Sequence, residues 1–237
     1  MDRTLSRTFR RLRGRPLSSA ARARLFAPLA ALGLLLVGLA GCSLVGGGPS
    51  FSPDGPCLVD GRAPGAYPEL EALVPARFDD RPPDRLDSGR NCSPENLAGL
   101  AASGITELRF AGGLWATGAE SGVTLAIFTA PGLTVEDLGA WYEAGARSAR
   151  KTSNIVVERP RLGGGTAYRI DLENGGQLQT IVVLPSAADV VRVVLVGSAA
   201  RDVRTPDAHA AIVERAIAAS LAAEAVRPEE VGTGAQE

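Results

Sequence analysis

The sequence predicts an α+β domain in which an antiparallel sheet of about six or seven strands packs against helices. Three observations favour this class. Four short apolar segments follow one another in the C-terminal half, separated by turn-forming residues. Amphipathic segments with helix-start signals lie before and after them. Strands and helices do not alternate regularly, as they would in a parallel sheet. The expected order is β-β-(β)-α-β-β-β-β-α.

The four C-terminal strand segments differ in their apolar pattern. In Thr166–Leu172 apolar and polar residues alternate, so one face of this strand is expected to meet solvent. Ile181–Leu184 and Val190–Val196 are almost continuously apolar, so they are expected at the centre of the sheet. The pattern predicts an antiparallel meander. Its strands are expected at Ile155–Arg159, Thr166–Leu172, Gln177–Leu184 and Val190–Gly197.

Strand signals are fewer in the N-terminal half of the domain. Ile105–Ala111 and Val123–Thr129 are strand-like, and Leu114–Thr117 is a possible strand between them. Before these segments, a short helix is expected at Pro68–Leu73. The proline- and charge-rich stretch from Arg77 to Asn91 is expected to be a loop.

Three further segments carry helix-start signals. Ser93 precedes Pro94 as an N-cap for a short helix that ends at Gly104. Thr134, with Asp137, begins a helix whose apolar face holds Leu138, Trp141, Tyr142 and Ala146. Thr205 and Pro206 begin the last helix, whose apolar residues recur at spacings of three and four; these are Ala210, Val213, Ile217 and Leu221.

The N-terminus has the organisation of an export signal. Eight arginines precede the apolar run Leu25–Leu39, which is shorter than the roughly 20 residues that a membrane-spanning helix needs. The run ends in Leu39-Ala40-Gly41-Cys42, which resembles the lipobox of bacterial lipoproteins. An uncleaved signal anchor is the alternative interpretation. The pair Arg10-Arg11 matches the twin-arginine export signature poorly, and the sequence does not decide the export route.

Resemblance to the lipoprotein family implies a covalent modification and a location. Cys42 would be diacylglycerated, and the signal peptide, residues 1–41, would be removed. The acyl chains of Cys42 would then anchor the protein in the bilayer, on the extracytoplasmic face of a bacterial membrane. Burial contributes about 0.8 kcal/mol per methylene, so two or three acyl chains hold firmly where one does not. Ser43 does not resemble an inner-membrane retention signal, but the sequence does not tell inner from outer membrane.

The mature chain divides into three parts. Residues 42–56 are rich in glycine, serine and proline and are expected to form a flexible tether. Residues 57–223 are long enough for a single domain with a sizeable core. The polar tail, residues 224–237, shows no periodicity and is expected to be flexible.

Removal of the leader makes the protein acidic. The leader contains eight arginines and one aspartate, so of 25 basic and 26 acidic residues the mature chain keeps 17 and 25, a net charge near −8. Such a chain repels polyanions, and it has no arginine cluster interleaved with aromatic residues. The composition therefore argues against nucleic acid as a partner.

Two cysteines remain once Cys42 is acylated. Cys57 and Cys92 form an even pair in a chain expected in an oxidising compartment, which predicts a disulfide. In the chain-entropy model, closing this loop of 36 residues stabilises the fold by roughly 3–4 kcal/mol. Two buried thiols are an alternative. A metal site is disfavoured, because His209 is the only histidine and no Cys-x-x-Cys is present, and no cofactor is expected.

The element order over residues 105–222, on a lipidated chain with a disulfide, is similar to the PsbP-like α/β/α sandwich. That fold also occurs in actinobacterial lipoproteins of the LpqN type. Ferredoxin-like and cystatin-like sheets fit the same order. The resemblance implies a binding or assembly module, and it carries no functional residue to this chain.

Catalytic residues are not evident in the sequence. His209 is expected on the surface of the last helix, and no Gly-x-Ser-x-Gly motif is present. Gly163-Gly164-Gly165 is interpreted as a hairpin turn, because it leads into a strand and lacks the lysine of a phosphate-binding loop. A cluster of aspartates is interpreted as a solvated loop with ion pairs, in preference to a calcium site; it contains Asp79, Asp80, Asp84 and Asp87.

These observations favour a non-enzymatic, membrane-anchored binding module over an enzyme. Its partner is expected to be a small apolar or amphipathic ligand or an envelope protein, and Trp115, if exposed, is a candidate ligand-binding residue. A structural or assembly role in the envelope is the alternative within this class. The alternative from another class is an envelope hydrolase that uses carboxylates such as Glu120, Glu158 or Asp171. A hydrolase requires an acidic pair with raised pKa values, whereas a binding module requires an apolar pocket or exposed apolar patch.

Overall fold

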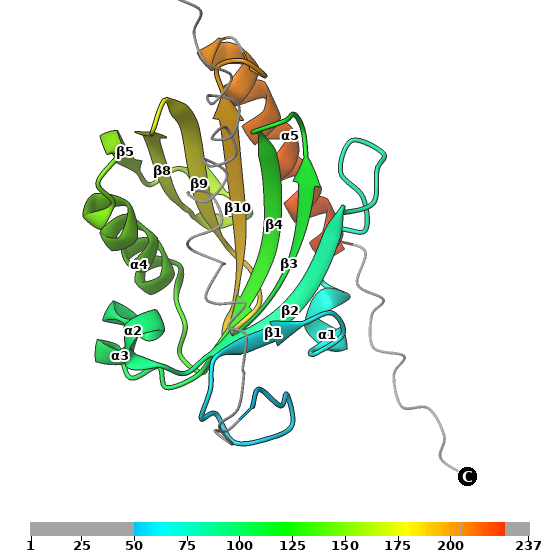
Figure 1. The fold of residues 1–237 in the computed structure, drawn as a ribbon, viewed down its shortest axis with the longest axis vertical. Helices are drawn as coiled ribbons and strands as arrows, with labels where there is room; N and C mark the ends of the chain where they lie inside the picture. Colours follow the sequence, from blue (N-terminus) through cyan, green and yellow to red (C-terminus); the bar gives the residue numbers. More distant parts are fainter. Residues whose placement is uncertain (1–49, 204, 226–237) are drawn as a thin grey trace, which may run out of the picture. The chain divides into compact units, whose positions relative to one another are not determined.

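The computed structural model describes residues 50–203 and 205–225. They form a sheet of eight antiparallel strands in the order β1-β2-β3-β4-β10-β9-β8-β5 (Figure 1). The strands are β1 Gly61–Ala63, β2 Arg85–Asn91, β3 Leu108–Ala116, β4 Gly122–Thr129, β5 Thr152–Glu158, β8 Tyr168–Asn174, β9 Gln177–Pro185 and β10 Val190–Ala199. A small hairpin of β6 Arg161–Leu162 and β7 Gly165–Thr166 follows β5. The predicted α+β class and the meander of the C-terminal strands are confirmed.

Helices lie on both faces of the sheet. They are α1 Pro68–Glu71, α2 Pro94–Leu97, α3 Gly99–Ala102, α4 Val135–Ser148 and α5 Pro206–Ala225. On one face, α4 packs on β9, β8 and β5 and contacts α3. On the other face, α5 lies over β10, β9 and β4, and α1 covers β2 and β3 (Figure 1). None of these helices is long and apolar enough to cross a membrane.

The predicted helix caps are present. The Thr134 side chain accepts a hydrogen bond from the backbone N–H of Asp137 at 3.1 Å, at the start of α4. Ser93 accepts from the N–H of Asn96 at 3.2 Å, at the start of α2. Each cap satisfies a backbone donor that has no partner within its own helix, which fixes where the helix begins.

The main hydrophobic core lies between the sheet and the helices α1 and α5. It is built from inward residues of β3, β4, β9 and β10 together with Val213 and Ala216 of α5. Trp115 is fully buried in this core, where its ring meets Phe78 edge-to-face at 6.2 Å and its Nε1–H donates to the Arg81 carbonyl at 2.9 Å.

Two parts of the sheet differ from the prediction. The segment from Arg77 to Asn91 is not a loop throughout, because β2 occupies its second half, paired with β1 and β3. The polar sequence of β2 does not predict a strand, because hydrogen bonds rather than apolar packing stabilise its buried residues Ser88 and Arg90. The strand predicted from Ile105 begins at Leu108 and continues through the glycine pair to Ala116, as one strand instead of two.

Candidate functional site

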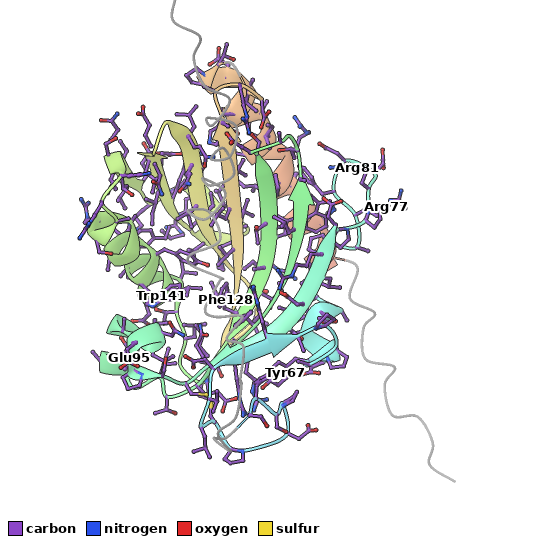
Figure 2. The ribbon with its side chains drawn as sticks, viewed as in Figure 1. Tyr67, Arg77, Arg81, Glu95, Phe128 and Trp141 are labelled. Carbon is purple, nitrogen blue, oxygen red and sulfur yellow. A yellow bond between two sulfur atoms is a disulfide. The ribbon has the colours of Figure 1, made fainter. Side chains whose placement is uncertain are left out.

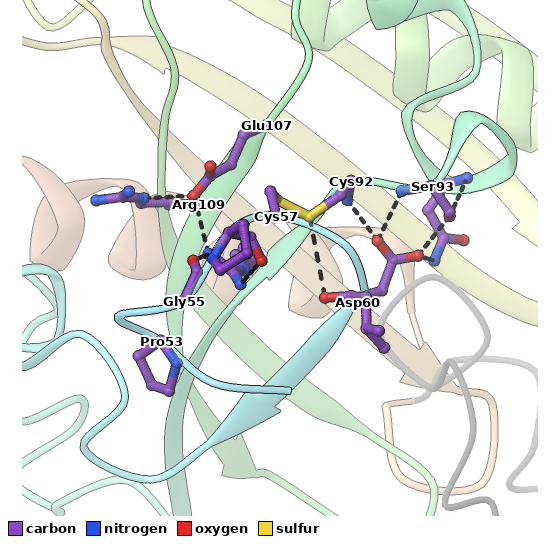
Figure 3. Close-up of a disulfide and its surroundings, with 12 residues drawn as sticks. Pro53, Gly55, Cys57, Asp60, Cys92, Ser93, Glu107 and Arg109 are labelled. Carbon is purple, nitrogen blue, oxygen red and sulfur yellow. Dashed lines mark hydrogen bonds and ion pairs between the residues drawn. A yellow bond between two sulfur atoms is a disulfide. The ribbon is translucent and has the colours of Figure 1, made fainter. Parts of the chain in front are cut away.

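The disulfide joins the start of the domain to the end of β2. Cys57 and Cys92 are bonded with a Cα–Cα distance of 5.8 Å, which confirms the predicted pair (Figure 3). Beside it, the Asp60 carboxylate accepts hydrogen bonds from the N–H groups of Cys92 and Ser93. Burial alone raises the pKa of Asp60, but these hydrogen bonds outweigh it, and its pKa lies below the ordinary value. The charged form of Asp60 therefore stabilises this corner of the fold.

A buried arginine holds the segment before the disulfide. The Arg90 guanidinium donates to the carbonyl oxygens of Gly55 at 2.8 Å, Ser52 at 2.9 Å and Pro56 at 2.8 Å. Residues 51–56 fall within the range assigned to the tether, and these bonds attach them to the domain. Residues 42–49 of the predicted tether, the lipobox that ends in Cys42 and the leader lie outside the described residues.

A chain of polar groups is buried beneath α5. The ring of His209 lies 2.9 Å from Thr180 Oγ1 through Nε2 and 2.8 Å from Ser198 Oγ through Nδ1. Thr180 also donates its hydroxyl proton to Asp171 at 2.6 Å, and Arg169 pairs with the same carboxylate at 2.6 Å. The expected surface position of His209 is therefore wrong. Its side chain joins α5 to the strands β8, β9 and β10.

The hydrogen-bond pattern defines the tautomer of His209. Thr180 has one hydroxyl proton and gives it to Asp171, so it accepts from His209, whose Nε2 carries the proton. Nδ1 is then an acceptor, and the Ser198 hydroxyl donates to it. Burial lowers the pKa of His209 and outweighs the attraction of Asp171, so the neutral ring is the stable form. Protonation would place a proton on Nδ1, so the Ser198 hydroxyl would have to turn and accept this hydrogen bond in place of donating it.

We expect acid to weaken the packing of α5. Because the folded pKa of His209 lies below its ordinary value of 6.5, its contribution is fully present above pH 6.5 and is lost as the pH falls toward the folded pKa. Urea unfolding measured between about pH 7 and pH 5 should show this loss. His209→Gln should flatten the slope in that window and leave it unchanged above pH 7. Equal slopes for the two proteins below pH 6.5 would contradict the assignment.

The predicted carboxylates do not form an acidic pair. Glu120 is paired with Arg201 at 2.6 Å, whereas Asp171 belongs to the network beneath α5. Glu158 stands opposite Arg169 in the sheet, on the same face as Asp171. Burial raises the pKa of Asp171, but hydrogen bonds from Arg169 and Thr180 reverse this, and the pKa lies below its ordinary value. That direction is opposite to what a general acid requires.

The aspartate cluster is spread over separate partners. Asp79 receives hydrogen bonds from Arg215 at 3.1 and 3.2 Å, and Asp84 accepts from the N–H of Ala116 at 2.7 Å. Asp87 lies on the far side of the sheet from Trp115. Within residues 50–203 and 205–225, no group of three or more metal-ligating side chains converges.

The two tryptophans of the sequence, Trp115 and Trp141, both pack against neighbouring elements. Trp115 is fully buried, so the exposure on which its candidate ligand-binding role depends is absent. Trp141 is half-buried on α4, where its Nε1–H donates to the Asn96 carbonyl at 3.2 Å and its ring meets Tyr142 edge-to-face at 4.9 Å (Figure 2). Both rings therefore stabilise packing between elements.

A different part of the molecule combines exposed apolar and charged side chains. It lies on the α4 side of the sheet, over strands β1, β2, β3, β4 and β10, beside the area that α4 covers (Figure 1). Residues directly opposite one another on neighbouring strands share a face, so the strand register defines its members. We call this area the open face. The solvent-accessible residues on it are Arg62, Arg85, Gly112, Leu114, Thr124 and Leu195, whereas Asp87, Ala126 and Val193 of the same face are buried.

Three charges meet at the β2 end of the open face. The Asp87 carboxylate, only 7% exposed, lies 2.5 Å from the Arg85 guanidinium and 3.7 Å from that of Arg62. Burial lowers the pKa of Arg62. The negative charge of Asp87 raises this pKa, and repulsion from Arg85 lowers it further. The two guanidiniums thus share one carboxylate and carry an excess positive charge.

Comparisons with known proteins give little guidance. No family model and no curated protein matches the chain. Among solved structures, the extracellular domain of PknH from Mycobacterium tuberculosis is similar at 16% identity, with a TM-score of 0.31. The match covers 68% of this chain and 98% of that chain. We therefore infer the function from the contacts of the chain's own residues.

Proposed function

We propose that this protein is a lipid-anchored, extracytoplasmic binding module that takes a small amphipathic ligand on its open face. Lipid anchoring is supported by the lipobox that ends in Cys42, and the disulfide between Cys57 and Cys92 is typical of an oxidising compartment. The observation that carries the proposal is the exposure of Leu114, 39% of whose surface is accessible, beside two arginines on one sheet face.

Burial of the polar network supports binding over catalysis. Ser198 and His209 are the one serine–histidine pair joined by a hydrogen bond in the described residues, at 1% and 7% exposure. A substrate does not reach a nucleophile that is covered by α5 and the sheet. The open face, in contrast, presents Leu114 and the Arg85 guanidinium to solvent.

Native mass spectrometry of the protein extracted from its own envelope tests the binding function. We expect a non-protein mass bound to the wild-type chain and absent from Gly112→Leu, whose added side chain would fill the open face. Wild-type protein with neither a bound small molecule nor a bound protein would contradict a binding function. A bound protein in place of a small molecule would favour the envelope-protein alternative.

Replacement of the predicted acylation site tests the anchor. Cys42→Ser should leave the leader uncleaved, because lipoprotein processing depends on the acylated thiol. Gel mobility and the mass of the tryptic N-terminal peptide report cleavage of the leader. Metabolic labelling of the cells with palmitate reports acylation. A variant that is cleaved before residue 42 and remains in the membrane fraction would contradict lipid anchoring at this cysteine.

A further inference from the structure

We propose that the β1 edge of the sheet faces the anchoring membrane, with Leu58 in contact with the lipid interface. This orientation rests on the proposed lipid anchor at Cys42. Three features of the chain point to it: the contacts that lock residues 51–57 to the domain, the length of chain between Cys42 and Phe51, and the exposure of Leu58.

The first locked residue is Phe51. A Cβ placed on Gly61 of β1 would lie 2.3 Å from Cγ of Phe51, so the aromatic ring packs directly on this edge strand. The Arg90 guanidinium lies 5.8 Å from the centre of the same ring. A guanidinium over an aromatic ring attracts it, and this contact stabilises Phe51 against β1.

The next residues are held through their backbone. Arg90 donates to three carbonyl oxygens of residues 52–56, and the Tyr67 hydroxyl donates to a fourth, that of Pro53, at 3.4 Å. The disulfide then fixes Cys57 to the end of β2 (Figure 3). This segment therefore belongs to the domain and adds nothing to the distance that the linker can span.

The chain between the lipid anchor and the domain is short as a result. Nine peptide units separate Cys42 from Phe51, and fully extended they span at most about 32 Å. If the chain were free as far as Cys57, its fifteen units would span about 54 Å. The contacts of Phe51 and Arg90 thus shorten the reach of the linker by about 22 Å.

This reach is too short for the domain to stand on the opposite edge of the sheet. β1 and β5 are the two edge strands of the eight-stranded sheet (Figure 1). Neighbouring strands lie about 4.8 Å apart, so the seven intervals from β1 to β5 span about 34 Å. A domain resting on β5 would hold Phe51 about that far from the bilayer, which even the fully extended linker does not span. The bilayer is therefore closer to β1 than to β5.

Leu58 is the side chain near this edge that suits a lipid interface. It lies three residues before β1 and is 68% exposed, the highest value among the large apolar side chains of residues 50–203 and 205–225. Residues 51–60 contain two aspartates and no lysine or arginine, so attraction to anionic lipid does not contribute to the contact. Burial of the apolar surface of Leu58 favours the contact instead.

Chemical attachment to vesicles tests the orientation without acylation in the cell. The mature chain, residues 42–237, lies entirely within the compact unit that begins at Gly38. Its disulfide leaves Cys42 as the one free thiol, which couples to a maleimide lipid in phosphatidylcholine vesicles. Leu58→Trp places an indole at the proposed contact. We expect its emission to shift to the blue and to be quenched by brominated lipid, because the indole enters the interface.

Two controls accompany this variant. Val156→Trp places the same probe on β5, at a residue that is 52% exposed, and it should show neither change. The parent chain, coupled in the same way, supplies the signal of Trp115 and Trp141 that is subtracted. Leu58→Trp combined with Cys42→Ser does not couple and should lose the quenching, because one apolar side chain does not hold a domain on a bilayer. Circular dichroism checks that each variant is folded.

The outcomes separate the orientation from the proposed anchor. Equal quenching of Leu58→Trp and Val156→Trp, or no quenching of coupled Leu58→Trp, would overturn the orientation. Equal quenching of Leu58→Trp with and without coupling would show that the linker does not set the contact, which also overturns it. Because the maleimide supplies the anchor, these results leave acylation of Cys42 to the cellular test of Cys42→Ser.

Discussion

Removal of the disulfide is expected to lower the free energy of unfolding by about 2–5 kcal/mol. The bond closes a loop with a sequence separation of 35, so its loss frees a long segment of the unfolded chain. In the folded state it holds the strand β2 beside the N-terminal segment that Arg90 binds. Both consequences destabilise the same edge of the sheet.

Urea unfolding of the mature chain measures this loss. The Cys57→Ser/Cys92→Ser double variant should shift the midpoint downward, and hydrogen exchange should rise most for residues 51–57. Reduction of the wild-type protein should reproduce the shift, whereas Cys42→Ser should not. An unchanged midpoint for the double variant would show that the hydrogen bonds of Arg90 and Asp60 hold this edge without the disulfide.

Gly139→Ala is expected to destabilise the protein by about 1–3 kcal/mol or more, although alanine favours helix formation. A Cβ on Gly139 would lie 2.1 Å from Cδ2 and 2.2 Å from Cγ of Tyr168. That ring is held by two contacts, because its hydroxyl donates to Glu143 and the Arg159 guanidinium lies 3.3 Å from its centroid. The ring therefore does not move aside, and α4 has to lift from β8.

A double-mutant cycle attributes the effect to this contact. Tyr168→Ala removes the ring and is expected to cost about 3–5 kcal/mol alone. Adding Gly139→Ala to it should cost clearly less than Gly139→Ala costs in the wild-type protein, because of the three close contacts only the one with the residue 168 Cβ, at 2.7 Å, remains. The matched control is Gly99→Ala in α3, where nothing lies within 4 Å of the added Cβ. It should stabilise the protein by about 0.5–1 kcal/mol. Additive costs for Gly139→Ala and Tyr168→Ala would refute the steric explanation.

Elements defined by local patterns were predictable from the sequence. The strands β9 and β10 follow from continuous apolar runs, and α4 follows from the Thr134 cap. The glycine inside α4 looks unfavourable in the sequence. Only the fold explains why glycine is required there, because the ring of Tyr168, 29 residues later in the chain, packs against Gly139.

Elements that depend on distant partners were not predictable. In β2, Arg90 is 2% exposed, and its partners are carbonyl oxygens more than 30 residues earlier in the chain. His209 of α5 is buried because Thr180 of β9 and Ser198 of β10 each form a hydrogen bond with one of its ring nitrogens. A pattern of apolar residues carries no signal for burial that is achieved through hydrogen bonds.

The open face depends on where a helix stops covering the sheet. The sequence shows Gly112 and Leu114 in a strand-like segment, but it does not show that α4 packs on β5, β8 and β9 and leaves strand β3 beside it. The opposite face of β3 holds Trp115, the aromatic residue that the sequence favoured for binding. The same strand therefore presents Trp115 to the core beneath α5, and Gly112 and Leu114 to the opposite face.

Residue-resolved nuclear magnetic resonance tests the location of the site most directly. Titration of the mature chain with the small molecule that copurifies from the envelope should shift the signals of the open face, above all those of Arg85, Gly112, Leu114, Thr124 and Leu195. Signals of Val213 and Ala216, beneath α5 on the opposite face, should stay unchanged. Shifts that cluster under α5, or that scatter over the surface without saturating, would contradict a binding site on the open face.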